Sequence, residues 1–361
     1  MAKRLISIGL LVCSLNNKIF SQSFINKLRT PISIKAKLNL GYDSNFLRLS
    51  ENEIKSDKIG MYGISSSLDS PIIKPSIQLV YTPYLFLTKQ TKITSSISYS
   101  YYSASKEKSF FITNFSIQQK LKPYSWFKIG YRYIPKYYLR NYIDRDSGRK
   151  DALLYSSCSF FSQKYFISYS HPISFINKLW AKLYTDYTQE YYNPNFTEFN
   201  LDKVMIQLDL NYYVTKRNRI KFSLSHGKAK NINYNSQLSS TQINRSYIFD
   251  KMSMVFLKKF NNDYNINELG LSIIFEQRYY ELDSKKYFID NWKYYLDGKY
   301  KLWFLWDFFA EVDLKTLYHY RWRDADTQLY GDFEWVEDSK SYSKHEFWIE
   351  LSYNFNSNFL Y

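Results

Sequence analysis

The chain has 361 residues, of which 45% are hydrophobic and 20% aromatic, and it carries a formal net charge of +16. Its mean hydropathy is −0.45, and no stretch after the N-terminus reaches the ~18 apolar residues of a spanning helix, which excludes a helical membrane protein. Membrane strands are not excluded, because only every second residue of such a strand faces lipid. Tyr outnumbers Phe, 37 to 27, and tyrosine suits a surface that is apolar along the ring and wet at its tip.

The N-terminus predicts an export signal. The basic segment Ala2–Arg4 precedes an apolar run over Leu5–Leu15, and a cleavage site follows near Ser21. We therefore expect residues 1–21 to be removed and residues 22–31 to form the N-terminal segment of the mature chain.

Cysteine usage and charge narrow the partners. A lipoprotein signal at Cys13 is the alternative to a cleaved export signal, although Val12 stands where that pattern needs a small residue. Without residues 1–21 the chain keeps only Cys158, which excludes an internal disulfide and a cysteine metal cluster. A basic balance is typical of nucleic-acid binding, of contact with phosphorylated lipid head groups, or of an anion-favouring pore. Because the export signal argues against the first, we expect no nucleic-acid partner. The sequence has no phosphate loop and no dinucleotide fingerprint, and we expect no cofactor.

Apolar and polar residues alternate with a period of two along most of the chain. Over 32–42, Ile, Ala, Leu and Tyr fill most even positions, while Ser, Lys and Asn fill most odd ones. The same pattern returns at 203–212, 220–225 and 268–276, and no period of 3.6 residues is sustained. The alternation predicts an all-β chain whose strands each have one apolar and one polar face.

Polar breaks separate these segments, and long breaks alternate with short ones. The long breaks fall near 43–58, 103–108, 141–149, 191–200, 229–244, 283–286 and 324–340, and the short ones near 88–91, 122–123, 171–175, 215–218, 260–263 and 297–303. This predicts a transmembrane antiparallel up-and-down β-barrel with short turns at one end and longer loops at the other. The count is fourteen strands, or sixteen if the long segment 59–87 hides a further hairpin. Pro83 and Pro135 are expected at strand ends, bulges or outer extensions.

The most regular stretch, 304–322, is interpreted as one strand that crosses the membrane. Its even positions are mostly apolar and its odd positions mostly charged, and the apolar face is aromatic at both ends and aliphatic between them. Two lipid–water interfaces select such bands, because Trp and Tyr settle at both. The stretch from Trp306 to Tyr318 would rise roughly 30 Å at ~3.3 Å per residue and ~40° of tilt, close to the ~25 Å apolar band of outer-membrane barrels.

The end of the chain is a further amphipathic segment, with apolar residues of one parity from Phe347 to the terminal Tyr361. A final strand that ends in an aromatic residue resembles the assembly signal of bacterial outer-membrane β-barrel proteins. Gly41–Asn45, which reads Gly-Tyr-Asp-Ser-Asn, is similar to a Gly-Tyr-Asp-x-Asn pattern in the first hairpin of porin-like barrels. The resemblance covers residues ~30–361, and we expect residues 32–361 to form a single barrel. It implies insertion by the outer-membrane assembly machinery, contact with outer-membrane lipids, and passive transport.

The parity opposite to the apolar face defines a charged lumen. Charges of both signs need water or opposed partners, so the lumen is either a hydrated channel or closed by salt-bridge networks. We favour the channel as the hypothesis. The candidate lumen-lining residues are Lys35, Lys37, Lys128, Arg132, Lys182, Asp186, Lys203, Asp209, Lys221, Glu268, Glu276, Asp307, Glu311, Asp313, Lys315, Arg321, Arg323, Lys344, Glu346 and Glu350.

A dense aromatic and charged stretch near an outer loop supplies candidate ligand contacts. Tyr138, Arg140 and Tyr142 could hold a sugar or another ligand by stacking and bidentate pairing. Packing that closes the loop is the alternative interpretation.

The sequence shows no sign of an enzyme. The chain has four histidines and no Gly-x-Ser-x-Gly elbow, and no serine and histidine are spaced to form a nucleophile–base pair. The sequence therefore predicts a porin-like outer-membrane channel for small hydrophilic solutes, favouring anions. The alternative is a barrel that acts as a binding or secretion accessory through its outer loops. Neither the solute nor an oligomeric partner can be assigned from the sequence.

Overall fold

The computed structural model describes residues 32–56, 62–86, 89–143, 155–232, 244–260, 266–280, 295–309, 312–325 and 340–357, with the side chains of residues 143, 295, 307–309, 356 and 357 excepted. The expected signal at 1–21 and the segment 22–31 lie outside these residues. Statements about the structure below concern the described part of the chain.

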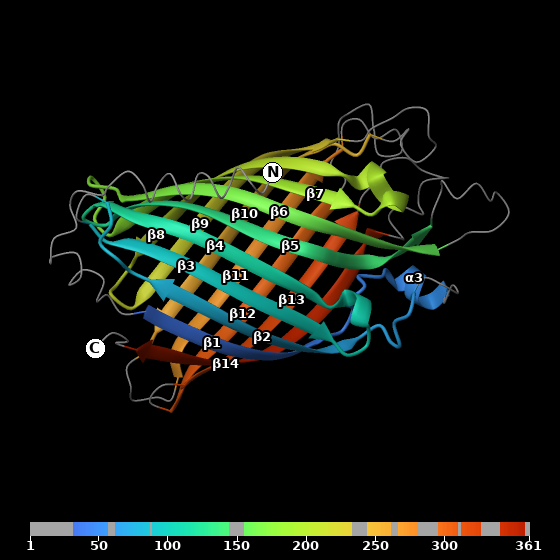
Figure 1. The fold of residues 1–361 in the computed structure, drawn as a ribbon, viewed down its shortest axis with the longest axis horizontal. Coiled ribbons are helices and arrows are strands. Elements are labelled where there is room, and N and C mark those ends of the chain that lie inside the picture. The colour runs from blue at the N-terminus through green and yellow to red at the C-terminus, as the bar shows by residue number, and fades with distance from the viewer. Residues whose placement is uncertain are drawn as a thin grey trace, which may run out of the picture.

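Fourteen antiparallel strands close into one barrel (Figure 1). They are β1 (Ile32–Asp43), β2 (Ser70–Tyr81), β3 (Thr91–Tyr102), β4 (Phe110–Lys122), β5 (Ser125–Ile143), β6 (Tyr155–Pro172), β7 (Leu179–Tyr192), β8 (Leu201–Tyr213), β9 (Asn218–Asn231), β10 (Tyr247–Lys259), β11 (Ile266–Tyr279), β12 (Tyr295–Phe309), β13 (Val312–Ala325) and β14 (Tyr342–Ser357). Each strand pairs with its neighbours in sequence, and β1 closes the barrel against β14, with Asp43 opposite Glu346. The predicted up-and-down barrel of fourteen strands is confirmed, and the described residues of the segment 59–87 contain one strand, β2.

The two ends of the barrel carry different connections. Mostly short turns join the strands at the end where β1 begins and β14 ends, and longer connections join them at the other end. The longer connections contain the helix α3 (Glu51–Ser56) and the 3-10 helices η1 (Lys106–Lys108) and η2 (Pro194–Phe199). Figure 1 places α3 at the right-hand end and the C-terminus at the left. We call the α3 end the outer mouth. Among the described helices, none combines the length and apolarity needed to cross a membrane.

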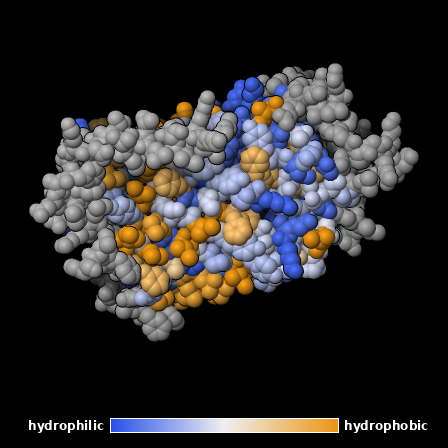
Figure 2. Space-filling view, in the orientation of Figure 1, coloured by the Kyte–Doolittle hydropathy of each residue, from blue (hydrophilic) through white to orange (hydrophobic). Residues whose placement is uncertain are grey.

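The outward face of the wall is apolar. Aliphatic side chains on it stay largely exposed, as for Ile77 at 56%, Leu183 at 54% and Ile206 at 57% of their full surface. Figure 2 shows hydrophobic side chains gathered over the wall, with hydrophilic ones concentrated toward the outer mouth. In water this exposure would be costly, at ~25 cal/mol per Å², whereas lipid removes the cost.

Aromatic rings border the apolar face. Near the outer mouth Tyr300 stacks on Trp322 at 5.0 Å between centroids, and Phe275 meets the same indole edge-on at 5.7 Å. Toward the turn end, Trp306 lies beside Phe304 and donates its Nε1 proton to Thr316 Oγ1 at 3.1 Å. Rings at both borders are what two lipid–water interfaces select.

The prediction of one strand over 304–322 is wrong. Residues up to Phe309 belong to β12 and those from Val312 to β13, and the two strands pair with Trp306 opposite Leu314. The break expected at 297–303 lies inside β12. Opposed residues of the two strands have the same parity, so the alternation of the sequence continues from β12 into β13 without a sign of the change of strand. The aromatic bands survive, but they border one hairpin rather than one strand.

Two bulges interrupt β5, one between Ile134 and Tyr137 and one between Tyr138 and Arg140. Pro135 falls in the first bulge, as expected of a residue that cannot donate to the ladder. Pro83 also matches its prediction, since it follows the end of β2 and its carbonyl accepts the Thr91 N–H at 2.7 Å. Each bulge changes which side of the wall the following residues face.

Glycines let aromatic rings lie flat against the wall on both faces. On the inner face a Cβ at Gly270 would overlap the indole of Trp303, and on the outer face a Cβ at Gly298 would overlap that of Trp322. An aromatic ring that covers a glycine on the neighbouring strand restores the contact that the glycine lacks. On the inner face the arrangement also keeps a large ring out of the lumen.

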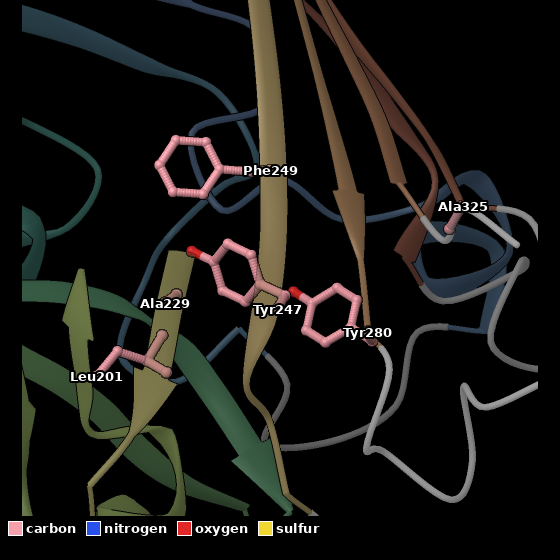
Figure 3. Packing of buried hydrophobic residues seen from close by; sticks show 6 residues of the cluster. All are labelled: Leu201, Ala229, Tyr247, Phe249, Tyr280 and Ala325. Atoms are coloured by element: carbon pink, nitrogen blue, oxygen red, sulfur yellow. The ribbon is translucent and has the colours of Figure 1, made fainter. Parts of the chain in front are cut away.

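Buried hydrophobic residues gather at the outer mouth in two clusters. One joins the outer ends of β8 to β13 and is drawn in Figure 3, where the rings of Tyr247 and Tyr280 lie side by side: Leu201, Ala229, Tyr247, Phe249, Tyr280 and Ala325. The other consists of Phe46, Leu47, Leu49 and Tyr138, and so packs the β1–β2 connection onto β5. The barrel is therefore packed near its outer mouth and charged below it.

Candidate functional site

The inner face of the wall carries the charge. It is opposite to the exposed aliphatic side chains, and the structure places on it every candidate lumen residue whose side chain is described. Asp307 and Glu311 are the two candidates whose side chains lie outside the described part. The placed candidates are Lys35 and Lys37 on β1, Lys128 and Arg132 on β5, Lys182 and Asp186 on β7, Lys203 and Asp209 on β8, Lys221 on β9, Glu268 and Glu276 on β11, Asp313, Lys315, Arg321 and Arg323 on β13, and Lys344, Glu346 and Glu350 on β14.

Many of these charges are paired along the wall. Lys344 Nζ lies 2.7 Å from Asp43 Oδ2 and 2.5 Å from Glu346 Oε1, and the ring of His319 bonds to the same Glu346 at 3.1 Å. Lys344 is 5% exposed, so this pairing is needed to hold its charge. Further ion pairs of the wall are Lys37–Glu350, Lys164–Asp186, Lys203–Glu190, Lys221–Asp209, Lys182–Asp209, Arg278–Glu276 and Lys35–Asp313.

Asp297 is an acid that sequence reasoning missed. Its carboxylate accepts from Arg321 Nε at 2.8 Å and from Arg323 Nη2 at 3.0 Å. Asp297 falls in the short break expected at 297–303, which removed it from the lumen assignment. The inward parity of β12 would have found it.

Several inward lysines have no acid partner within the described part of the chain. Lys301 and Lys315 both lie over the ring of Trp303, with their Nζ atoms 5.6 and 5.1 Å from its centroid. Lys299 and Lys74 are further inward cations for which the described residues offer no ion pair. Half-buried cations without acids need water or a mobile anion. We call Lys74, Lys299, Lys301 and Lys315 the lysine wall.

A cavity of about 600 Å³ occupies the outer half of the lumen. Among the residues that line it, eleven are Arg or Lys and three are Asp or Glu. The cations are Arg48, Arg132, Arg140, Lys164, Lys203, Arg245, Lys251, Arg278, Arg321, Arg323 and Lys340, and the acids are Asp186, Glu190 and Glu276. The cavity is therefore strongly cationic, and we call it the outer cavity.

Several of these cations lie over aromatic rings. The guanidinium of Arg245 lies 4.1 Å from the centroid of Phe199, that of Arg140 4.7 Å from Tyr142, and that of Arg278 5.0 Å from Tyr247. A guanidinium that lies over a ring keeps its N–H edge for a further partner. The outer cavity thus combines stacked cations with nine aromatic residues in its lining.

The β1–β2 connection folds back into the outer mouth. The Asn45 side chain accepts the Leu49 N–H at 2.9 Å and donates to the Leu49 and Ser343 carbonyls at 2.8 and 3.2 Å. Between them Arg48 has a positive φ of 58°, a conformation uncommon for a side chain of this size. Leu47 and Arg48 thereby reach the outer cavity.

An ion pair ties this connection to β5. Ser50 and Glu53 form a capping box at the start of α3, and both carboxylate oxygens of Glu53 accept from Arg140, at 2.7 and 3.0 Å. The Arg140 side chain is 7% exposed and that of Glu53 18%. This largely buried ion pair therefore attaches the β1–β2 connection to β5.

The three candidate ligand contacts of the sequence have different surroundings. Tyr138 packs with Phe46, Leu47 and Leu49 and is 1% exposed. Arg140 and Tyr142 line the outer cavity. The second bulge in β5 separates them, which alternation alone could not indicate.

Lys108, from the connection between β3 and β4, braces the same region. Its Nζ donates to the Tyr138 and Leu139 carbonyls at 2.8 and 3.0 Å. Burial lowers the pKa of Lys108 from 10.5 to about 8, and the nearby cations Arg48 and Lys344 act in the same direction.

The fold and this lumen together define a class. A closed antiparallel barrel with an apolar outer face, aromatic borders and a charged interior is a transmembrane β-barrel.

Comparison with known proteins adds similar folds. No family model matches the chain, and no curated protein matches it. Among solved structures, the TodX monoaromatic hydrocarbon channel is 8% identical over 91% of both chains, with a TM-score of 0.48. The outer membrane channel DcaP of Acinetobacter baumannii is 9% identical over 90% of this chain and 97% of its own, at 0.45. An anion-selective porin from Comamonas acidovorans is 7% identical over 90% and 98%, at 0.39. At such low similarity we transfer no function from these proteins.

Proposed function

We propose that this chain is an outer-membrane channel through which small hydrophilic solutes pass, with anions favoured. The observation that carries the proposal is the excess of cations over acids around the outer cavity, continued below it by the lysine wall. A fixed positive potential raises the local concentration of anions and lowers that of cations. The apolar outer face supports the membrane location.

Export and insertion belong to the same proposal. A signal over residues 1–21 would direct the chain across the inner membrane, and the outer-membrane assembly machinery would insert the barrel among outer-membrane lipids. N-terminal sequencing of the mature protein tests the first step, with a start close to Gln22 expected.

Reversal potentials test the channel and its selectivity. The refolded mature chain is placed in a planar bilayer with a KCl gradient across it. We expect ionic current and a chloride permeability above that of potassium. Absence of current at any voltage would refute the channel, and a preference for potassium would refute the anion selectivity.

A variant pair links the selectivity to the lysine wall. Replacing Lys299 and Lys301 by Gln removes two inward charges and should lower the chloride preference. The matched control is Lys228→Gln on β9, an exposed lysine of the outward parity, which should leave the reversal potential unchanged.

A further inference from the structure

We propose that the outer cavity is a saturable binding site for an acidic sugar, a hydroxylated ring that carries a carboxylate. The inference rests on the proposed function, because the site lies within the lumen of the channel. Its volume of about 600 Å³ falls in the ~300–1,000 Å³ range of small-molecule sites.

The charge of the ligand follows from cations that the described residues leave without an acid. Arg48, Arg132 and Arg245 line the cavity, and no ion pair joins any of them to a described acid. The Nε atoms of Arg132 and Arg245 are buried and have no hydrogen-bond partner. Guanidinium forks bind carboxylates with two parallel hydrogen bonds, so an anionic ligand would satisfy them.

The ring of the ligand follows from the cavity wall. Phe160, Tyr192 and Phe199 form one connected group, with centroids 5.0 and 5.4 Å apart. Tyr247 and Tyr280 form a second group at 5.0 Å, shown in Figure 3. Both groups face the cavity. A flat or chair-shaped ring could stack on either group while its carboxylate reaches the guanidinium edges.

Hydroxyl groups on the ligand follow from a buried phenol. Tyr342 lines the cavity and is 6% exposed, and its hydroxyl has no hydrogen-bond partner. Six of the lining aromatic residues are tyrosines: Tyr137, Tyr142, Tyr192, Tyr247, Tyr280 and Tyr342. A purely apolar ring would leave the Tyr342 hydroxyl unpaired, whereas a sugar hydroxyl can pair with it.

The β1–β2 connection makes the site ready before the ligand arrives. Asn45 and the Glu53–Arg140 pair fix the backbone on both sides of Arg48. Arg48 is thus held at the cavity with little freedom to lose on binding, which favours affinity.

Block of the chloride current by sugars tests the site. Sodium glucuronate added on the side of the outer mouth should reduce the current with saturation, while glucose and benzoate should each need at least about tenfold higher concentrations. Block by glucose at the same concentration as glucuronate would refute the requirement for a charged ligand. Stronger block by benzoate than by glucuronate would refute the requirement for sugar hydroxyl groups. Calorimetric titration of the detergent-solubilised protein with glucuronate measures binding independently of the channel recording. If the protein conducts but does not bind glucuronate, this site alone is refuted. If it binds glucuronate but does not conduct, the channel alone is refuted.

Two variants with matched controls locate the ligand. Arg245→Gln should raise the half-blocking glucuronate concentration by about tenfold, and Tyr342→Phe should raise it severalfold while keeping the ring. Lys230→Gln at the outer end of β9 and Tyr165→Phe on the lipid-facing wall are the controls, both exposed. Unchanged block in both Arg245→Gln and Tyr342→Phe would overturn the site. A normal chloride current in the absence of glucuronate shows that each variant has folded.

Discussion

The paired cations at the outer mouth and the cations of the lysine wall have opposite surroundings. At the mouth, Arg140 and Lys344 are almost fully buried and each meets an acid at 2.7 Å. In the wall, Lys299, Lys301 and Lys315 are half-buried and lack an acid partner among the described residues. The first arrangement resembles a protein core and the second a wetted surface.

The difference separates the paired charges, which hold the shape of the molecule, from the unpaired charges, which act on solutes. A buried cation without a partner costs several kcal/mol, so the paired charges at the mouth belong to its packing with Phe46, Leu47 and Leu49. A half-buried cation in water costs little and stays available to a passing anion. Substitutions of paired charges at the mouth should therefore change stability first, and substitutions of unpaired cations in the lumen should change selectivity first.

The largest effect is expected from Glu53→Ala. It removes the capping box of α3 and leaves Arg140 buried without its acid, at a cost of about 3 kcal/mol. Amides of the connection over 44–56 should exchange hydrogen about 100-fold faster. Lys55→Gln is the control, because its ion pair with Glu51 is 75% and 86% exposed; equal exchange in both variants would show that the pair does not hold the mouth.

Raising the pH should stabilise the mouth by about 2 kcal/mol between pH 7 and 9.5. The pKa of Lys108 is lowered to about 8 in the folded chain, so above pH 8 the unfolded chain binds more protons and stability rises until the unfolded pKa near 10.4. The change in urea midpoint over this window, compared with Lys108→Met, isolates the contribution. The control Lys106→Met replaces an exposed lysine and should keep the pH dependence of stability. If Lys108→Met also kept this pH dependence, Lys108 would not be its source.

Gly270→Ala should cost about 1–2 kcal/mol and lower the single-channel conductance. The new methyl overlaps the Trp303 ring, which must swing into the lumen. Gly298→Ala creates the same overlap with Trp322 on the lipid-facing side, so it should cost similar stability without lowering conductance. A conductance loss in both would mean that the barrel deforms as a whole.

The smallest effect is a shift in selectivity of about twofold for Asp297→Asn, equivalent to about 0.4 kcal/mol. Loss of this carboxylate removes a negative charge beside Arg321 and Arg323 and should raise the chloride preference, read as a reversal potential. Asp250→Asn, whose carboxylate is exposed beside His226 on the outward parity, should have no effect. A lowered chloride preference in Asp297→Asn would contradict the claim that the Asp297 carboxylate lowers the positive potential of the lumen.

Strand number, parity and loop order could be predicted from the sequence because the dyad pattern and the polar breaks are local. The β12–β13 hairpin could not, since the sequence from Phe309 to Val312 keeps the parity of the alternation, while Asp297–Gly298 imitates a turn inside β12. The same error hid Asp297, Lys299 and Lys301 from the lumen assignment. Lys74 was missed because 59–87 could not be divided.

The outer mouth was the least predictable region. Two bulges in β5 change the facing of Tyr138 relative to Arg140, and no residue type marks them except Pro135. The inward fold of the β1–β2 connection depends on contacts between residues far apart in sequence, such as Asn45 with Ser343 and Glu53 with Arg140. Such long-range contacts have no local signature.

Reaction of neighbouring cysteines tests most directly whether the two faces of the wall meet different solvents. In a Cys158→Ser background, Lys315→Cys and Leu314→Cys are each exposed in the bilayer to a charged, membrane-impermeant thiol reagent. The account predicts that the residue at 315 reacts and changes the chloride current, while the residue at 314 stays unmodified. Reaction at 314 without reaction at 315 would contradict a water-filled interior.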